Sequence, residues 1–109
     1  MRSTISIGER DVEMAANAAS PFIYHKIFGE DFLLKTQDGS GDIELYIKMA
    51  FVMAKQAEIG EADMMKGKVT EADFIQWLTE FENMDMINAL PEIVTVYMKQ
   101  KKTSSVPKK

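Results

Sequence analysis

The chain contains no cysteine among its 109 residues. This absence excludes disulfide bonds, thiolate nucleophiles and cysteine-ligated zinc. No apolar run reaches the roughly 18–20 residues that a transmembrane helix needs. The first eleven residues, MRSTISIGERD, also lack the apolar stretch of a signal peptide. These absences predict a soluble protein of a reducing cytoplasm.

The sequence also lacks the motifs of catalysis and metal binding. It has no glycine-rich phosphate loop and no nucleophile elbow. His25 is the only histidine, and no pattern around it supplies partners for a metal or a catalytic group. The stretch from Asp38 to Asp42 resembles the start of a calcium loop, but Ile43 and Met49 stand where that loop needs Gly and Glu. We therefore expect no enzyme, no catalytic residue, no metal ligand and no cofactor.

Charge is distributed unevenly along the chain. Residues 1–98 hold 17 acidic and eight basic side chains, a net charge of −9. Residues 99–109 hold five lysines and no acid, a net charge of +5. An acidic body repels nucleic acid, so only the basic segment could attract it. We expect residues 99–109 to form a flexible basic tail, with Lys99, Lys101, Lys102, Lys108 and Lys109 as its charges.

The most apolar stretch is DIELYIKMAFVMAKQAEI, from Asp42 to Ile59. Asp42 can cap a helix here and Gly60 can end it. Apolar residues surround most of this helix, and only Glu44, Lys48 and Lys55 form a polar line. A helix of this kind is covered on several sides. It is therefore either the core helix of a small domain or a helix partly covered by another chain.

Shorter patterns surround this central helix. Alternation over residues 4–15 predicts a β-hairpin with Ile5, Ile7, Val12 and Met14 facing inward. Ser20-Pro21 predicts a helix start with Ser20 as the cap, an apolar face of Phe22, Ile23, Ile27 and Phe28, and a stop at Gly29. A second short helix is expected over residues 30–35, and the central helix could fray on through Met65.

Two helices are expected in the C-terminal half. Thr70 and Asp73 predict a capping box, followed by an amphipathic helix with Phe74, Trp77 and Phe81 mainly in the core. A last helix is expected over residues 85–100, where Pro91 either kinks the helix or begins a new one with Leu90 extended. The expected fold is mainly α (α+β): an N-terminal hairpin and four to five helices around the central helix near residues 42–60, in one domain over residues 1–98.

Methionine is abundant, with nine residues. Its flexible, polarizable side chain suits surfaces that adapt to varied apolar partners, and it also fills gaps in cores. Four methionines near element ends are the candidates for a partner-binding surface: Met64, Met65, Met84 and Met86.

The order of features along the chain resembles a known family. The hairpin is followed by AASPFIYHKIFGEDFL at residues 18–33, then by DFIQWL at 73–78, ALPEIVTVYM at 89–98, and TSSVPKK at the end. In this order they resemble the tail assembly chaperones of long-tailed bacteriophages, of the type found in phages and prophages of Gram-positive bacteria. The resemblance covers nearly the whole chain.

The resemblance implies a late protein of virion morphogenesis in the cytoplasm of a bacterial host. Such proteins bind the long, helical, aggregation-prone tape measure protein, help tail tube protein assemble on it, and are absent from the finished tail. Many are also made in a longer form by a programmed ribosomal frameshift, which makes that form a further expected partner. The family has no catalytic residues.

Two other functions remain open at this point. One is a structural or adaptor subunit of a tail or head–tail junction, which would be present in purified virions. The other is a small nucleic-acid-associated regulator using the lysine tail, and the negative charge of the body counts against it. A homo-oligomer is compatible with the sequence, and no membrane partner is expected.

Overall fold

The computed structural model describes residues 2–37 and 43–104. Within them a two-stranded hairpin is followed by seven helices, which confirms the α+β class. The elements are β1 (Arg2–Ile7), β2 (Arg10–Ala15), α1 (Ser20–Phe28), α2 (Phe32–Gln37), α3 (Ile43–Ile59), α4 (Glu61–Met65), α5 (Glu71–Leu78), α6 (Asn83–Asn88) and α7 (Leu90–Ser104).

The hairpin forms in the predicted register. Ile5 pairs with Val12 and Ser3 pairs with Met14 across an antiparallel ladder. The four predicted inward residues are buried, and β2 packs along α3. Gly8 occupies the turn with a φ of +64°, and a Cβ at this position would collide with the Asp85 carboxylate. The positive φ is what favours glycine here, because the Asp85 carboxylate is the end of a flexible side chain that can shift.

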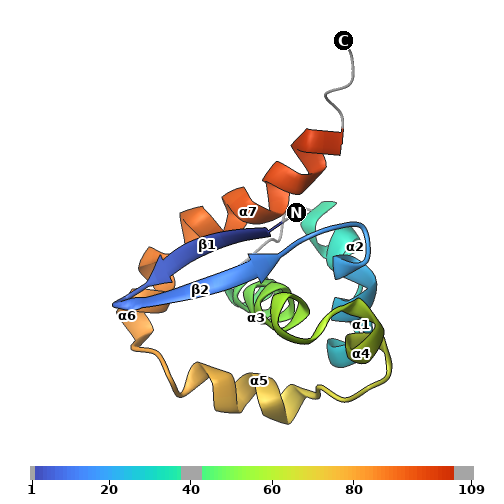
Figure 1. The fold of residues 1–109 in the computed structure, drawn as a ribbon, viewed down its shortest axis with the longest axis horizontal. Coiled ribbons are helices and arrows are strands. Elements are labelled where there is room, and N and C mark those ends of the chain that lie inside the picture. The colour runs from blue at the N-terminus through green and yellow to red at the C-terminus, as the bar shows by residue number, and fades with distance from the viewer. Residues whose placement is uncertain (1, 38–42, 105–109) are drawn as a thin grey trace.

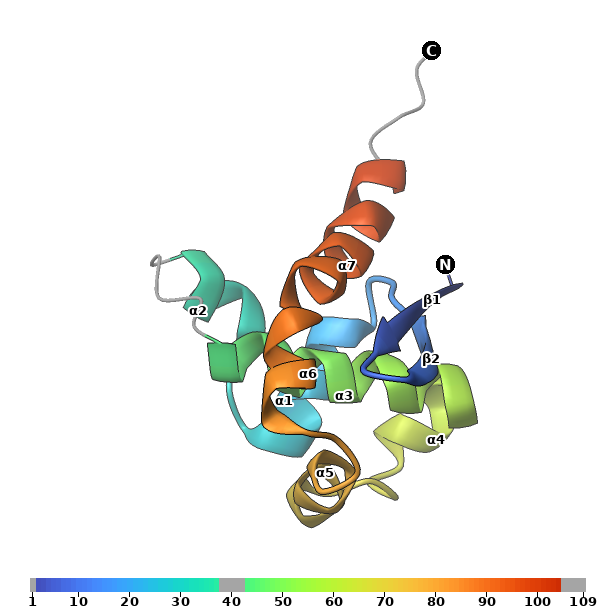
Figure 2. The same cartoon turned by 90° about the vertical axis from the view of Figure 1, so that its left-hand side faces the viewer.

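Helix α3 is the core helix of the domain. Figures 1 and 2 show it at the centre, beneath the hairpin, with α7 on one side and α5 on the other. Nine of its side chains are buried, Phe51 and Met53 among them. Gly60, with a φ of +88°, ends α3, so α4 is a separate helix instead of a continuation. The predicted cap Asp42 lies outside the described residues.

Aromatic rings connect the helices around α3. Phe32 of α2 contacts Tyr97 of α7 and Tyr24 of α1, with ring centroids 5.0 and 5.2 Å apart. Phe51 of α3 contacts Phe74 and Trp77 of α5 at 5.4 and 5.6 Å. Tilted and edge-on pairs at these distances stabilise a core beyond simple burial. The burial of Phe74 and Trp77, and the packing of half-buried Phe81 against the core, confirm the predicted role of all three.

Helix α1 corrects two predictions. It begins at Ser20, with Ala19 in the cap position, and the Ser20 hydroxyl turns into the core. Phe22 is 70 % exposed instead of belonging to the apolar face. The inward stripe runs through Ile23 and Tyr24, and Phe22 lies outside that stripe on the 3.6-residue period.

The Ser20 hydroxyl belongs to a buried polar network at the C-terminal end of α3. It donates a hydrogen bond to Gln56 Oε1 at 2.8 Å. Gln56 Nε2 in turn donates to Asn17 Oδ1 at 3.1 Å and to Glu61 Oε2 at 3.0 Å. Asn17 Nδ2 also donates to Glu61 Oε2, at 2.8 Å. The amide of Gln56 thus has both its hydrogens and its oxygen satisfied, as burial requires.

The C-terminal region resolves the question of Pro91. Helix α6 ends at Asn88 and α7 begins at Leu90, so Pro91 lies in the first turn of a new helix and Leu90 is helical, not extended. The capping box of Thr70 and Asp73 is confirmed, with the Thr70 N–H donating to Asp73 Oδ2 at 2.8 Å. Helix α7 continues to Ser104, six residues into the predicted tail, and projects from the body in both views (Figures 1 and 2).

Candidate partner-binding surfaces

The four candidate methionines do not form one surface. Met64 and Met86 are buried in the core, whereas Met65 and Met84 are 44 % and 59 % exposed. The exposed pair is divided between α4 and α6, which lie on opposite sides of the molecule in Figure 1. Met64 and Met86 are therefore withdrawn as surface candidates, because their side chains fill the interior. Methionine content alone does not distinguish these two uses.

Three exposed aliphatic side chains lie instead on α2 and in the first turn of α3. Leu33 and Leu34 directly follow the buried Phe32 on α2, and both are exposed. Ile43, also exposed, lies one turn before Tyr46, whose ring is 5.6 Å from that of Phe32. We call Leu33, Leu34 and Ile43 the α2 surface. It exposes three large apolar side chains to solvent, on a domain that buries most of its other apolar side chains.

A buried cation supports this end of α3. Lys48 is 8 % exposed, although the sequence predicted it on a polar line. Its Nζ lies 3.1 Å from Glu44 and 3.6 Å from Glu30, and 5.1 Å from the centroid of the Phe28 ring. Burial alone would lower the pKa of Lys48. The hydrogen bond to Glu44 and the nearby carboxylates outweigh it, so the pKa is raised above 10.5.

Glu30 links this cation to the aromatic core. The Tyr24 hydroxyl donates a hydrogen bond to Glu30 Oε1 at 2.9 Å, the same oxygen that faces Lys48. Tyr97, which packs against Phe32, has a pKa raised above 10 because burial and the neighbouring Tyr46 disfavour its charged form. The base of the α2 surface is thus held by both aromatic and ionic contacts.

A second candidate surface is a groove between β2, the C-terminal half of α3, and α5. Its volume is about 480 Å³. Small or buried side chains form its floor: Val12, Ala54, Ala57 and Trp77. Charged side chains form its rim: Arg10, Asp11, Glu13, Lys55, Glu58 and Glu80. We call it the β2–α5 groove.

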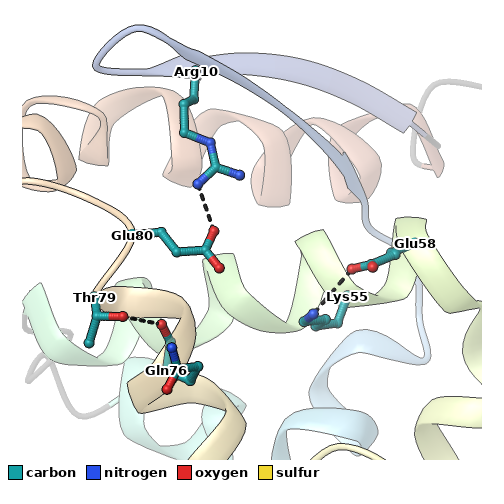
Figure 3. Close-up of polar contacts among 6 residues, drawn as sticks. All are labelled: Arg10, Lys55, Glu58, Gln76, Thr79 and Glu80. Carbon is teal, nitrogen blue, oxygen red and sulfur yellow. Dashed lines mark hydrogen bonds and ion pairs between the residues drawn. The ribbon is translucent and has the colours of Figure 1, made fainter.

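Two ion pairs lie on the rim of this groove, one between β2 and the turn after α5 and one within α3, as Figure 3 shows. Arg10 Nη1 lies 2.6 Å from Glu80 Oε1, and the Arg10 guanidinium stacks 4.8 Å from the centroid of the Phe81 ring. Lys55 Nζ lies 3.2 Å from Glu58 Oε1. Below the rim, the Thr79 hydroxyl donates to the Gln76 carbonyl at 2.6 Å and closes the end of α5. Both ion pairs are solvent-exposed and individually weak.

The remaining predicted positions show no comparable arrangement. His25 is exposed, with Nδ1 3.3 Å from the Glu30 carbonyl oxygen. Over residues 2–37 and 43–104, no three histidine or carboxylate side chains gather in a way that could hold a metal ion. Lys99, Lys101 and Lys102 fall on the last turns of α7, whereas Lys108 and Lys109 lie outside the described residues. None of the helices described is both long and apolar enough to cross a membrane.

Comparisons of this chain with models of protein families, with curated proteins and with solved structures found no match. The two surfaces are therefore interpreted from their own chemistry.

Sequence reasoning missed both surfaces for different reasons. The α2 surface was hidden because a six-residue helix has too few positions to show that Phe32 faces the core and both leucines face solvent. The β2–α5 groove was hidden because its parts are distant in sequence, with Arg10 and Glu80 separated by 70 positions. A signal for the groove did exist in Ala54 and Ala57, since small residues on a core helix leave room beside it.

Proposed function

We propose that this protein is a phage tail assembly chaperone that binds the tape measure protein and promotes assembly of the tail tube, without remaining in the mature virion. The observation that carries the proposal is the α2 surface, where Leu33, Leu34 and Ile43 are exposed on an otherwise well-packed acidic domain. The order of sequence features that resembles this family supplies the identity of the partner.

The chemistry of the α2 surface suits an apolar helical partner. Aliphatic side chains on a short helix and on the first turn of α3 can cover the apolar stripe of a long helix, as in helix-in-groove recognition. The support beneath them is rigid, because Phe32 is buried among three aromatic rings. A preorganised apolar surface loses less entropy on binding than a mobile one. The surrounding acidic charge keeps the free protein soluble.

Co-expression with the tape measure protein encoded nearby tests the proposal. We expect the tape measure protein to become soluble and to co-purify with this chain. The double variant Leu33→Ser and Leu34→Ser should return it to the insoluble fraction. Ile75→Ser is the matched control, because Ile75 is 57 % exposed on α5, away from α2 in Figure 1. Solubility is measured by centrifugation and co-purification by affinity capture.

The outcomes separate this proposal from its alternatives. A tape measure protein that stays insoluble with this chain, and also with any frameshifted longer form, would contradict the chaperone. Finding the chain in purified virions would indicate a structural or adaptor subunit. Nucleic-acid binding that falls steeply with salt and vanishes on deletion of residues 99–109 would indicate a regulator.

A further inference from the structure

We propose that the β2–α5 groove binds a lysine or arginine side chain presented by a basic segment of a partner protein. The proposal concerns a surface separate from the α2 surface, so each can fail without the other. It goes beyond the chaperone proposal, which assigns no role to this groove.

The size and lining of the groove admit a long side chain. Ala54 and Ala57 stand one turn apart on α3, and both line the groove. Their small side chains leave a hollow of about 480 Å³ beside Trp77, which is buried and also lines the groove. A hollow of this size holds one or two large side chains but is far too small for a folded element.

The distribution of polarity selects a cation. The floor is apolar, whereas the rim carries four carboxylates and two cations. Lysine and arginine match this arrangement, because they bury an aliphatic stem against apolar atoms and keep the charged head at a polar boundary. An anionic ligand, nucleic acid included, would meet an excess of negative charge on the rim and on the body as a whole.

A cation that enters the groove must compete with Arg10 and Lys55 for the carboxylates with which they already pair. Arg10 occupies Glu80 at 2.6 Å, and Lys55 occupies Glu58 at 3.2 Å. All four side chains are at least partly exposed, so their contacts exchange with water at low cost. A partner cation therefore competes with Arg10 for Glu80. Removing Arg10 should strengthen partner binding, whereas removing Glu80 should weaken it.

The only tryptophan of the chain gives a local readout, because Trp77 lines the groove. The probe is a synthetic alanine- and leucine-rich helical peptide that presents a single lysine. Its partner probe is the same peptide with glutamate in place of lysine. We expect the lysine peptide to change the Trp77 fluorescence and to bind more weakly as salt is raised, and the glutamate peptide to do neither.

Variants that are expected to change the affinity for the lysine peptide in opposite directions make the test sharper. Glu58→Gln with Glu80→Gln should weaken binding of the lysine peptide roughly 2- to 30-fold, the range expected when two exposed charge contacts are lost. Arg10→Gln should strengthen it. Asp63→Asn with Glu92→Gln makes the same charge change outside the groove and should leave affinity within about twofold. Circular dichroism confirms that each variant is folded.

Three results would overturn the proposal. The lysine and glutamate peptides could bind equally, the control pair could weaken binding as much as the groove pair, or Arg10→Gln could weaken it. A fourth result would overturn the choice of partner. In it, a peptide of residues 99–109 binds with the same response to the groove variants as the lysine peptide, and deleting that segment abolishes self-association in gel filtration. The groove would then bind a second copy of this chain.

Discussion

The two ends of α3 use polar groups in opposite ways. At the C-terminal end, Gln56 is buried and fully hydrogen-bonded to Ser20, Asn17 and Glu61. At the N-terminal end, Lys48 is buried against the Phe28 ring and two carboxylates, and Ile43 in the first turn of the same helix is exposed. One end closes the fold around a satisfied network, and the other supports an apolar surface open to water.

The difference separates the polar contacts that fix the positions of the helices from those that tolerate rearrangement. A neutral amide with every group satisfied fixes the positions of three segments, α1, α3 and α4, because any shift leaves buried polar atoms without partners. A charged amine held by Glu30 and Glu44, both of which reach solvent, tolerates rearrangement more easily. We therefore expect the C-terminal end to dominate stability and the N-terminal end to dominate binding.

Gln56→Ala should have the largest effect and tests the closed end. The substitution removes one acceptor and two donors from a buried site, leaving polar atoms of Ser20 and Asn17 with fewer partners. We expect the free energy of unfolding to fall by about 2–4 kcal/mol. Urea denaturation followed by circular dichroism measures it. A loss below about 0.5 kcal/mol would contradict the assigned role of the network.

Lys48→Met should have a smaller effect and tests the open end. Methionine keeps the aliphatic volume against Phe28, and the two carboxylates that lose their cation remain hydrated. We expect a loss of about 1 kcal/mol or less. The same denaturation experiment gives the value. A loss equal to that of Gln56→Ala would remove the contrast between the two ends.

Alkaline pH should weaken the N-terminal end selectively. The folded pKa values of Lys48 and Tyr97 are both raised. Each group therefore binds its proton more tightly in the folded state, so its contribution is complete below the unfolded pKa of about 10. That contribution is lost as pH rises through the folded pKa. Stability should fall above about pH 10, and less steeply in Lys48→Met and Tyr97→Phe, as denaturation at successive pH values would show.

The double variant Leu33→Ser and Leu34→Ser should have the smallest effect on stability. Both side chains are already exposed, so their removal leaves the core intact. We expect a change within about 0.5 kcal/mol, measured by thermal unfolding. A large loss would mean that the α2 surface holds the fold together, and its effect on partner binding could no longer be interpreted.

Local rules explain how much of the fold was predictable. The hairpin register follows from alternation around Gly8, and the capping box of Thr70 and Asp73 involves positions three apart. Pro91 permitted only two outcomes, and the structure shows the new helix start. Each of these depends on a few adjacent residues, so the sequence contains all the information required.

Burial was less predictable, because it depends on which distant segment covers a face. Phe22 belonged to the expected apolar face and is exposed, whereas Lys48 belonged to a polar line and is buried. Met64 and Met86 were surface candidates and lie in the core. In each case residue type suggested one environment, and packing between α1, α3 and their neighbours imposed the other.

Caps, turns, periodicity and charge are properties of neighbouring residues, so the order of the hairpin and the main helices, the acidic body and the basic C-terminal segment could be read from the sequence. The Gln56 network, the α2 surface and the β2–α5 groove depend on how the helices and the hairpin pack together. Each of these joins groups that are far apart in the chain, such as Arg10 and Glu80, and only folding brings such groups within reach of one another.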